Sequence, residues 1–233
     1  MDLKLDCKVQ NYFFSNRDFD YEIKSKLKTL RVSPDNLAIN FIDHVLPRYF
    51  GEDEKKKISL LVKHLQKFPF DLVYKNYLSH PIRVAASYCL FLDKPTYDDV
   101  VLALWHNIIE AELELPEKVD PDNRFLSDKV RDEIKRLTID RSRQKDLSYL
   151  NAYYDNLLEG QSKSNLILIK ALDKLDNTYG WVKMDMSGYN SDVVLHFVCP
   201  RLEKVNCDLT KYLRELTQYV LKESTKKKYE DIW

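Results

Sequence analysis

The chain has 233 residues and a balanced charge, with 37 Lys and Arg residues against 37 Asp and Glu residues. A chain of this length can bury one substantial core, so one main domain is expected. Because the formal net charge is zero, no general field favours binding to nucleic acid or to an anionic membrane surface. Nucleic acid is therefore not an expected partner.

Glycine and cysteine usage narrows the class of protein further. The 4 glycines leave no room for a glycine-rich phosphate loop, which argues against kinases and dehydrogenases. The 4 cysteines are scattered and form no CxxC pair, and a chain of this length does not need disulfide bonds for its stability. This cysteine usage predicts that the protein resides in a reducing cytoplasm. No stretch approaches the roughly 18 uncharged residues of a spanning helix, so no membrane partner is expected.

The first third of the chain indicates two amphipathic helices after an extension. Residues 1–33 are assigned no role, although residues 21–30 have the pattern of a short helix. The sequence SPDN at 33–36 predicts a helix start with Pro34 in its first turn, and apolar residues at helical spacing continue to near Gly51. A second helix is expected from about residue 52 to residue 68.

Two histidines fall on the next two predicted helices. His80 precedes Pro81, which favours an extended backbone at His80 and places the proline in the first turn. The run from Val100 to Ile109 predicts a strongly apolar helix whose polar exceptions are His106 and its neighbours Asn107 and Glu110. His106 and Glu110 share a helical face because they are four residues apart. Buried polar groups of this kind need partners.

The remaining chain continues the helical pattern. Helices are expected at about 130–137, 147–158, 192–198 and 202–222, with a proline-rich loop at 115–124 and a break at Pro200. The segment KALDKLDN at 170–177 places Asp173 and Asn177 on one face of a helix. The fold class predicted is all-α, a single-domain helical bundle over residues 34–225, with an extension at 1–33 and a solvated tail at 226–233.

His80, His106 and Asp173 are the candidate metal ligands. Imidazole and carboxylate groups on separate helices suit a divalent transition metal, namely Mn, Fe, Zn or Co, whereas calcium and magnesium sites use oxygen ligands. The alternative is that His106, Asn107 and Glu110 form a hydrogen-bonded group inside the bundle and bind no metal.

These motifs give the chain a family resemblance. The segments HPIRVA, ALWHNIIE and LIKALDKLDN, in this order and at these separations, resemble the HD-domain phosphohydrolases, closest to the (p)ppGpp hydrolase domain of stringent-response enzymes. The similarity covers roughly residues 60–181. It implies a helical bundle of the HD-domain type, with His80, His106, Asn107 and Asp173 as metal ligands. The metal ion that it implies is manganese, with Fe, Zn or Co as alternatives. It also implies that Lys174 and Asn177 bind a nucleotide, with Arg83 near a phosphate.

The chain departs from the family at two acidic positions. Asn107 stands where the family has the Asp of its His-Asp pair, so a neutral amide replaces a charged ligand. Glu110 keeps the first member of the family's Glu-Asp pair, and Ala111 replaces the second. The expected function is a metal-dependent phosphohydrolase acting on a nucleotide or another phosphorylated small molecule, with Glu110 as the catalytic proton acceptor. The alternative is a catalytically impaired relative that binds a nucleotide or a protein partner.

Overall fold

The computed structural model describes residues 18–29, 32–66, 78–92, 94–109, 126–159, 163–181 and 187–223. All regular structure within these ranges is helical, and they contain no strand, which confirms the all-α prediction. The chain divides into two compact units, one made of residues 32–144 and one that joins residues 1–31 to residues 145–233. The domain boundaries predicted after residues 33 and 225 stay predictions.

The unit of residues 32–144 begins as the sequence predicts. Helix α3 (Pro34–Asn40) has Ser33 as its N-cap, whose side chain accepts a hydrogen bond from the Asn36 backbone N–H at 3.3 Å. The helical run then changes type, to a π-helix at η1 (Phe41–Val45) and a 3₁₀ helix at η2 (Leu46–Arg48). Pro47 explains this change, because proline lacks an N–H and crowds the carbonyl four residues before it.

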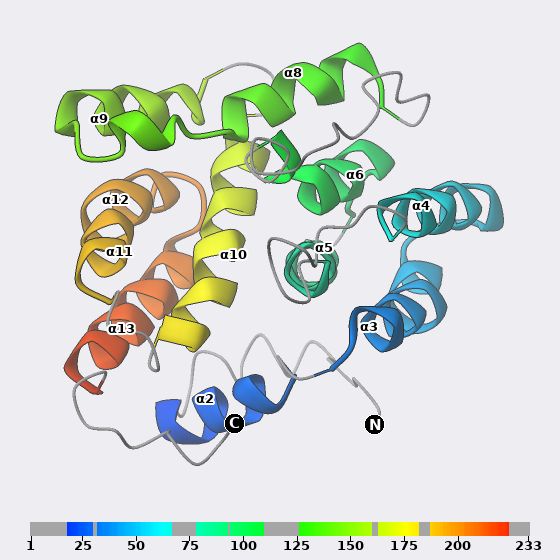
Figure 1. The fold of residues 1–233 in the computed structure, drawn as a ribbon, viewed down its shortest axis with the longest axis horizontal. Helices are drawn as coiled ribbons and strands as arrows, with labels where there is room; N and C mark the ends of the chain where they lie inside the picture. Colours follow the sequence, from blue (N-terminus) through cyan, green and yellow to red (C-terminus); the bar gives the residue numbers. More distant parts are fainter. Residues whose placement is uncertain are drawn as a thin grey trace. The chain divides into compact units, whose positions relative to one another are not determined.

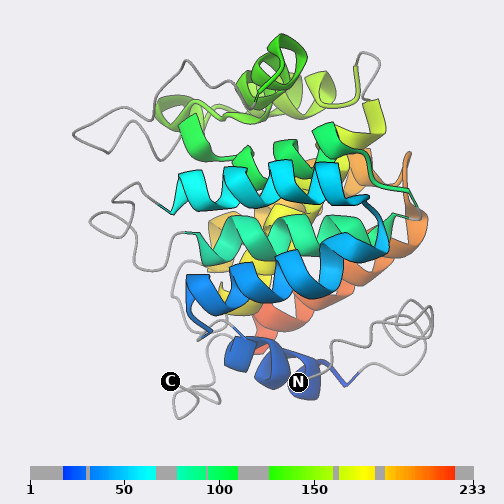
Figure 2. The ribbon, with the colours of Figure 1, turned by 90° about the vertical axis from the view of Figure 1, so that its right-hand side faces the viewer.

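The longer helices of this unit pack side by side (Figure 2). Helix α5 (Ser79–Phe91) contacts α3 and α6 (Tyr97–Trp105), and α6 also contacts α4 (Glu52–Leu65) and α8 (Asp128–Leu137). A capping box fixes the start of α6, since the Thr96 side chain accepts from the Asp99 backbone N–H and the Asp99 carboxylate accepts from Thr96. A short 3₁₀ helix, η4 (Arg141–Arg143), follows α8. The two histidine-bearing helices, α5 and α6, are thus direct neighbours.

The other unit is arranged around α10 (Lys163–Trp181), which contacts α2 (Phe19–Thr29), α12 (Cys199–Leu202) and α13 (Cys207–Glu223) (Figure 1). Helix α9 (Leu147–Asn156), helix α11 (Ser187–Val193) and the π-helix η5 (Val194–Val198) complete the described part of the unit. The break predicted at Pro200 is wrong: the helical run passes through this residue and stops after Leu202. A proline near the start of a helical segment needs no N–H partner, and the wider π-turn just before it makes room for its ring.

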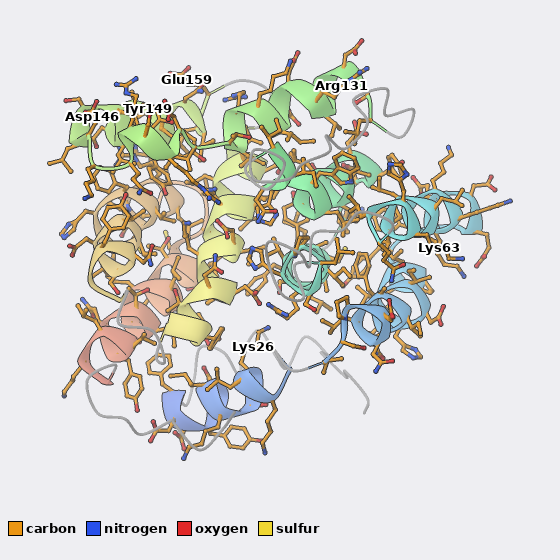
Figure 3. The ribbon with its side chains drawn as sticks, in the orientation of Figure 1. Lys26, Lys63, Arg131, Asp146, Tyr149 and Glu159 are labelled. Atoms are coloured by element: carbon orange, nitrogen blue, oxygen red, sulfur yellow. The ribbon has the colours of Figure 1, made fainter. Side chains whose placement is uncertain are left out.

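Helix α2 belongs to the core of this second unit, although no role was predicted for residues 1–33 from the sequence. Its residues Ile23 and Leu27 are buried. The Tyr212 hydroxyl of α13 donates to Glu22 Oε2 at 2.7 Å and lies against the Tyr179 hydroxyl of α10. Lys26, labelled in Figure 3, lies 4.0 Å from the Asp176 carboxylate of α10 and over the Tyr179 ring. The N-terminal helix is therefore tied to α10 and α13 by buried polar contacts.

Within the described ranges, no helix combines enough length with enough apolar character to span a bilayer.

Candidate metal centre

His80 lies in the first turn of α5, inside the helix rather than before it. The expectation of an extended His80 is wrong, because α5 starts at Ser79 and the Ile82 backbone N–H already donates to the Leu78 carbonyl at 3.2 Å. Pro81 causes no break here, since the first backbone N–H groups of a helix have no intrahelical acceptor. His80 is half-buried, between the buried Ser79 and Pro81.

His106 lies at the carboxyl end of α6, not in the middle of a helix as the sequence indicated. Helix α6 ends at Trp105, residues 106 and 107 form a turn, and residues 108 and 109 are helical again. The His106 Nδ1 nitrogen is 2.7 Å from the Ala103 carbonyl oxygen, and a carbonyl can only accept, so Nδ1 carries the proton. This bond occupies the carbonyl that a continuing α-helix would offer to the Asn107 N–H, which accounts for the break.

The hydrogen bond to Ala103 also selects the tautomer of His106. A neutral imidazole protonated at Nδ1 has its lone pair on Nε2, and this is the atom that can bind a metal ion. Backbone carbonyls commonly hold metal-binding histidines in this way. The His106 side chain is fully buried, so its orientation is fixed by packing as well as by this bond.

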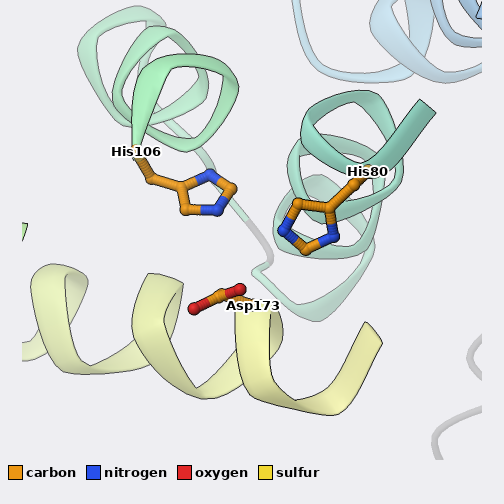
Figure 4. Close-up of side chains that lie close together, drawn as sticks. All are labelled: His80, His106 and Asp173. Carbon is orange, nitrogen blue, oxygen red and sulfur yellow. The ribbon is translucent and has the colours of Figure 1, made fainter. Parts of the chain in front are cut away.

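The two imidazole rings are neighbours within the unit of residues 32–144. Their centroids are 5.2 Å apart and their planes are inclined by 69°, so the edge of one ring approaches the face of the other. Figure 4 shows His80 and His106 extending toward each other from two separate helices. The contact of α5 with α6 therefore holds two imidazole nitrogen donors close together, one in the first turn of α5 and one just after the end of α6.

The other predicted site residues of this unit are less fully placed. Arg83 is half-buried on α5, one turn after His80, and Asn107 is half-buried in the turn that follows α6. Glu110 and Ala111 lie outside the described residues. A shared helical face for His106 and Glu110 requires a continuous helix between them, and the turn at residues 106 and 107 interrupts it.

In the other unit, Asp173 is a buried carboxylate in the middle of α10, with 4% of its surface exposed. Asn177 Nδ2 donates to Asp173 Oδ1 at 2.7 Å, one helical turn away, as the spacing of the two residues predicts. Lys174 Nζ lies 3.4 Å from Asp173 Oδ2. Lys174 and Asn177 thus both contact the Asp173 carboxylate from the same helix.

Lys170 is the residue of this cluster that the sequence did not single out. Its side chain is buried, and its Nζ lies 3.5 Å from Asp173 Oδ2. Burial raises the pKa of the nearby Tyr154 phenol. The positive charge of Lys170 lowers this pKa, and the negative charge of Asp173 raises it further. The sequence feature that could have identified Lys170 is its position three residues before Asp173, which places the two side chains on one face of the helix.

Comparisons of the chain with protein-family models, with curated proteins and with solved structures find no significant match. The HD-domain resemblance thus rests on the sequence motifs alone.

Proposed function

We propose that this chain binds a divalent transition metal ion through His80, His106 and Asp173 and hydrolyses a phosphate ester of a nucleotide or of another small molecule. One observation carries the proposal: the His80 and His106 rings, from two neighbouring helices of one unit, have their centroids 5.2 Å apart. The family resemblance adds Asp173, a buried carboxylate of the other unit, as the third ligand. Two imidazole nitrogens and one carboxylate oxygen are donors that suit Mn, Fe, Zn or Co.

The donor set agrees with the chemistry of such a centre. The Nε2 lone pair of His106 is directed by the bond from Nδ1 to the Ala103 carbonyl oxygen, and this arrangement is the usual support for a metal-binding imidazole. The bound ion would lower the pKa of a water molecule and so supply a hydroxide nucleophile near neutral pH. His80 and Asp173 complete a set of three protein ligands, which leaves positions open for water and substrate.

The remaining roles follow the family resemblance and the donor chemistry of each side chain. Lys174 carries a positive charge suited to a phosphate, and Asn177 offers an amide to a nucleotide hydroxyl. Arg83 supplies a second cation for a phosphate group. Glu110 accepts a proton from the attacking water. The resemblance points to guanosine polyphosphates such as (p)ppGpp as the substrate class.

Metal binding tests the first half of the proposal. Protein purified without a chelator is analysed for metal content, and manganese is titrated calorimetrically into the wild type and into His80→Ala and His106→Ala. Each substitution should weaken binding by at least about tenfold, the scale set by changes around metal ligands. His44→Ala, an exposed histidine of η1, is the matched control and should bind like the wild type. Equal affinity in all four proteins would exclude this centre.

Activity tests the second half. The manganese-loaded protein should release phosphate or pyrophosphate from (p)ppGpp or from simple nucleotides, and His106→Ala should not. The second candidate is a relative that binds a nucleotide or a protein partner without hydrolysis. It is favoured by Asn107 and Ala111, which replace two acidic residues of the family pattern. A metal-loaded protein that binds nucleotide but is inert to the whole substrate panel would establish that second candidate.

A further inference from the structure

Lys170 is a buried cation on α10. Only 3% of its surface is exposed, and lysine is almost never buried to this degree unless an opposite charge accompanies it. That charge is Asp173, whose Oδ2 lies 3.5 Å from Lys170 Nζ. Because the two residues are three apart on one helix, the helix itself holds them together.

The Asp173 carboxylate is shared between several donors. Lys174 Nζ is 3.4 Å from the same Oδ2, and Asn177 Nδ2 donates to Oδ1 at 2.7 Å, so both oxygens have partners. Two cations thus face one anion. The Lys174 side chain is 20% exposed, so water partly screens its charge, whereas the charge of Lys170 is screened much less.

We propose that Lys170 is a positioning residue that holds the Asp173 carboxylate and competes with a divalent metal ion for it. The inference rests on the proposed function, because it takes Asp173 as a metal ligand. An ion bound to Asp173 would bring two positive charges close to a buried ammonium group, where repulsion is strong. The affinity of the centre for metal is therefore set in part by Lys170, and the metal-free chain keeps Asp173 ion-paired.

Lys170→Met tests this, because methionine keeps an unbranched chain of similar length and removes the charge. Manganese titrated into the wild type and the variant by calorimetry should show a dissociation constant lower by about tenfold or more in the variant. Lys170→Arg keeps the charge and should keep the wild-type affinity. Lys174→Met should give a smaller gain, and Lys211→Met, an exposed lysine of α13, should give none.

A second measurement needs no metal. In chelator, urea unfolding of Lys170→Met, Asp173→Asn and the double variant forms a double-mutant cycle. Each single variant should lower stability, because it leaves a buried charge with fewer partners, and the double variant should recover part of that loss. Additive losses would overturn the proposed pairing of Lys170 with Asp173.

The outcomes separate this inference from the proposed function. If the wild type binds manganese, His80→Ala does not, and Lys170→Met binds equally or more weakly, the competition is refuted and the metal centre stands. If the wild type and Lys170→Met both fail to bind manganese, the metal centre and the competition are refuted together. Binding by Lys170→Met alone would support both.

Discussion

The two ring nitrogens of His106 have different roles. Nδ1 donates to the Ala103 carbonyl at 2.7 Å and ends the α6 helix, and Nε2 keeps the lone pair that a metal ion needs. The residue that follows, Asn107, lies in the same turn, where the family pattern has an aspartate.

Asn107→Asp is expected to raise the affinity for manganese by about tenfold or more. An amide offers a carbonyl oxygen to a cation but cannot balance its charge as a carboxylate does. Calorimetric titration of both proteins measures the difference, with Asn36→Asp in α3 as a control for the added charge. Equal or weaker binding by Asn107→Asp would show that position 107 does not face the ion.

Glu110→Gln separates proton transfer from metal binding. A glutamine amide cannot accept a proton at neutral pH, so hydrolysis should be lost in the wild-type and the Asn107→Asp backgrounds while manganese affinity is largely retained. Phosphate release and calorimetry on the same preparations provide the two readouts. Unchanged hydrolysis by Glu110→Gln would assign the proton acceptor to another group.

At the scale of elements, α2 is held by polar contacts in a buried setting. The Tyr212 hydroxyl donates to Glu22 of α2 and also lies against the Tyr179 hydroxyl, while the Tyr219 hydroxyl donates to Asp20. Burial raises the pKa of both Tyr179 and Tyr212, so these phenols stay protonated and keep their hydrogen bonds across the usual pH range. The contacts join a helix near the N-terminus to one near the C-terminus.

Tyr212→Phe is expected to cost roughly 1–3 kcal/mol, because it removes the hydroxyl that donates to Glu22 and hydrogen-bonds with the buried Tyr179 hydroxyl. Urea unfolding measures the loss, and hydrogen exchange should show faster opening of α2. Tyr21→Phe, at an exposed tyrosine of the same helix, is the control and should change stability little. A loss no larger than that of Tyr21→Phe would mean that apolar packing alone holds α2.

On the scale of the whole molecule, buried thiols report on the folding of each unit. Burial raises the pKa of Cys89 to about 12 and that of Cys199 to about 11. An unfolded thiol ionises near pH 8.5. As pH rises above about 9, the unfolded chain therefore holds fewer protons than the folded chain, and these two groups lower stability with increasing pH.

Thiol labelling at pH 9 tests this point. Iodoacetamide should modify the exposed Cys207 in the folded protein, and Cys89 and Cys199 only when urea unfolds the unit that contains each. Peptide mass spectrometry identifies the labelled residues, and Cys207→Ser serves as the control. Labelling of Cys89 at the rate of Cys207 without urea would contradict the burial of α5. Cys7 lies outside the described residues.

The sequence by itself determined the helical class and the starts of several helices. Apolar residues at a spacing of three and four, the cap at Ser33 and the capping box at Thr96 are local signals, and local signals act through neighbouring residues alone. The spacing of Asp173 and Asn177 likewise predicted their contact, because a helix converts a separation of four residues into proximity. The choice of candidate ligands came from the residue types and their order.

The helical state of His80, the end of α6 at Trp105 and the passage of a helix through Pro200 differ from the expectation for local reasons, because hydrogen bonds within a few residues and π-winding outweighed average preferences. Tertiary structure decided what depends on residues far apart in the chain. The role of α2 rests on partners nearly 200 residues away in the sequence. The burial of Lys170 beside Asp173 likewise depends on the helices that cover α10, and no periodic pattern along one segment contains that information.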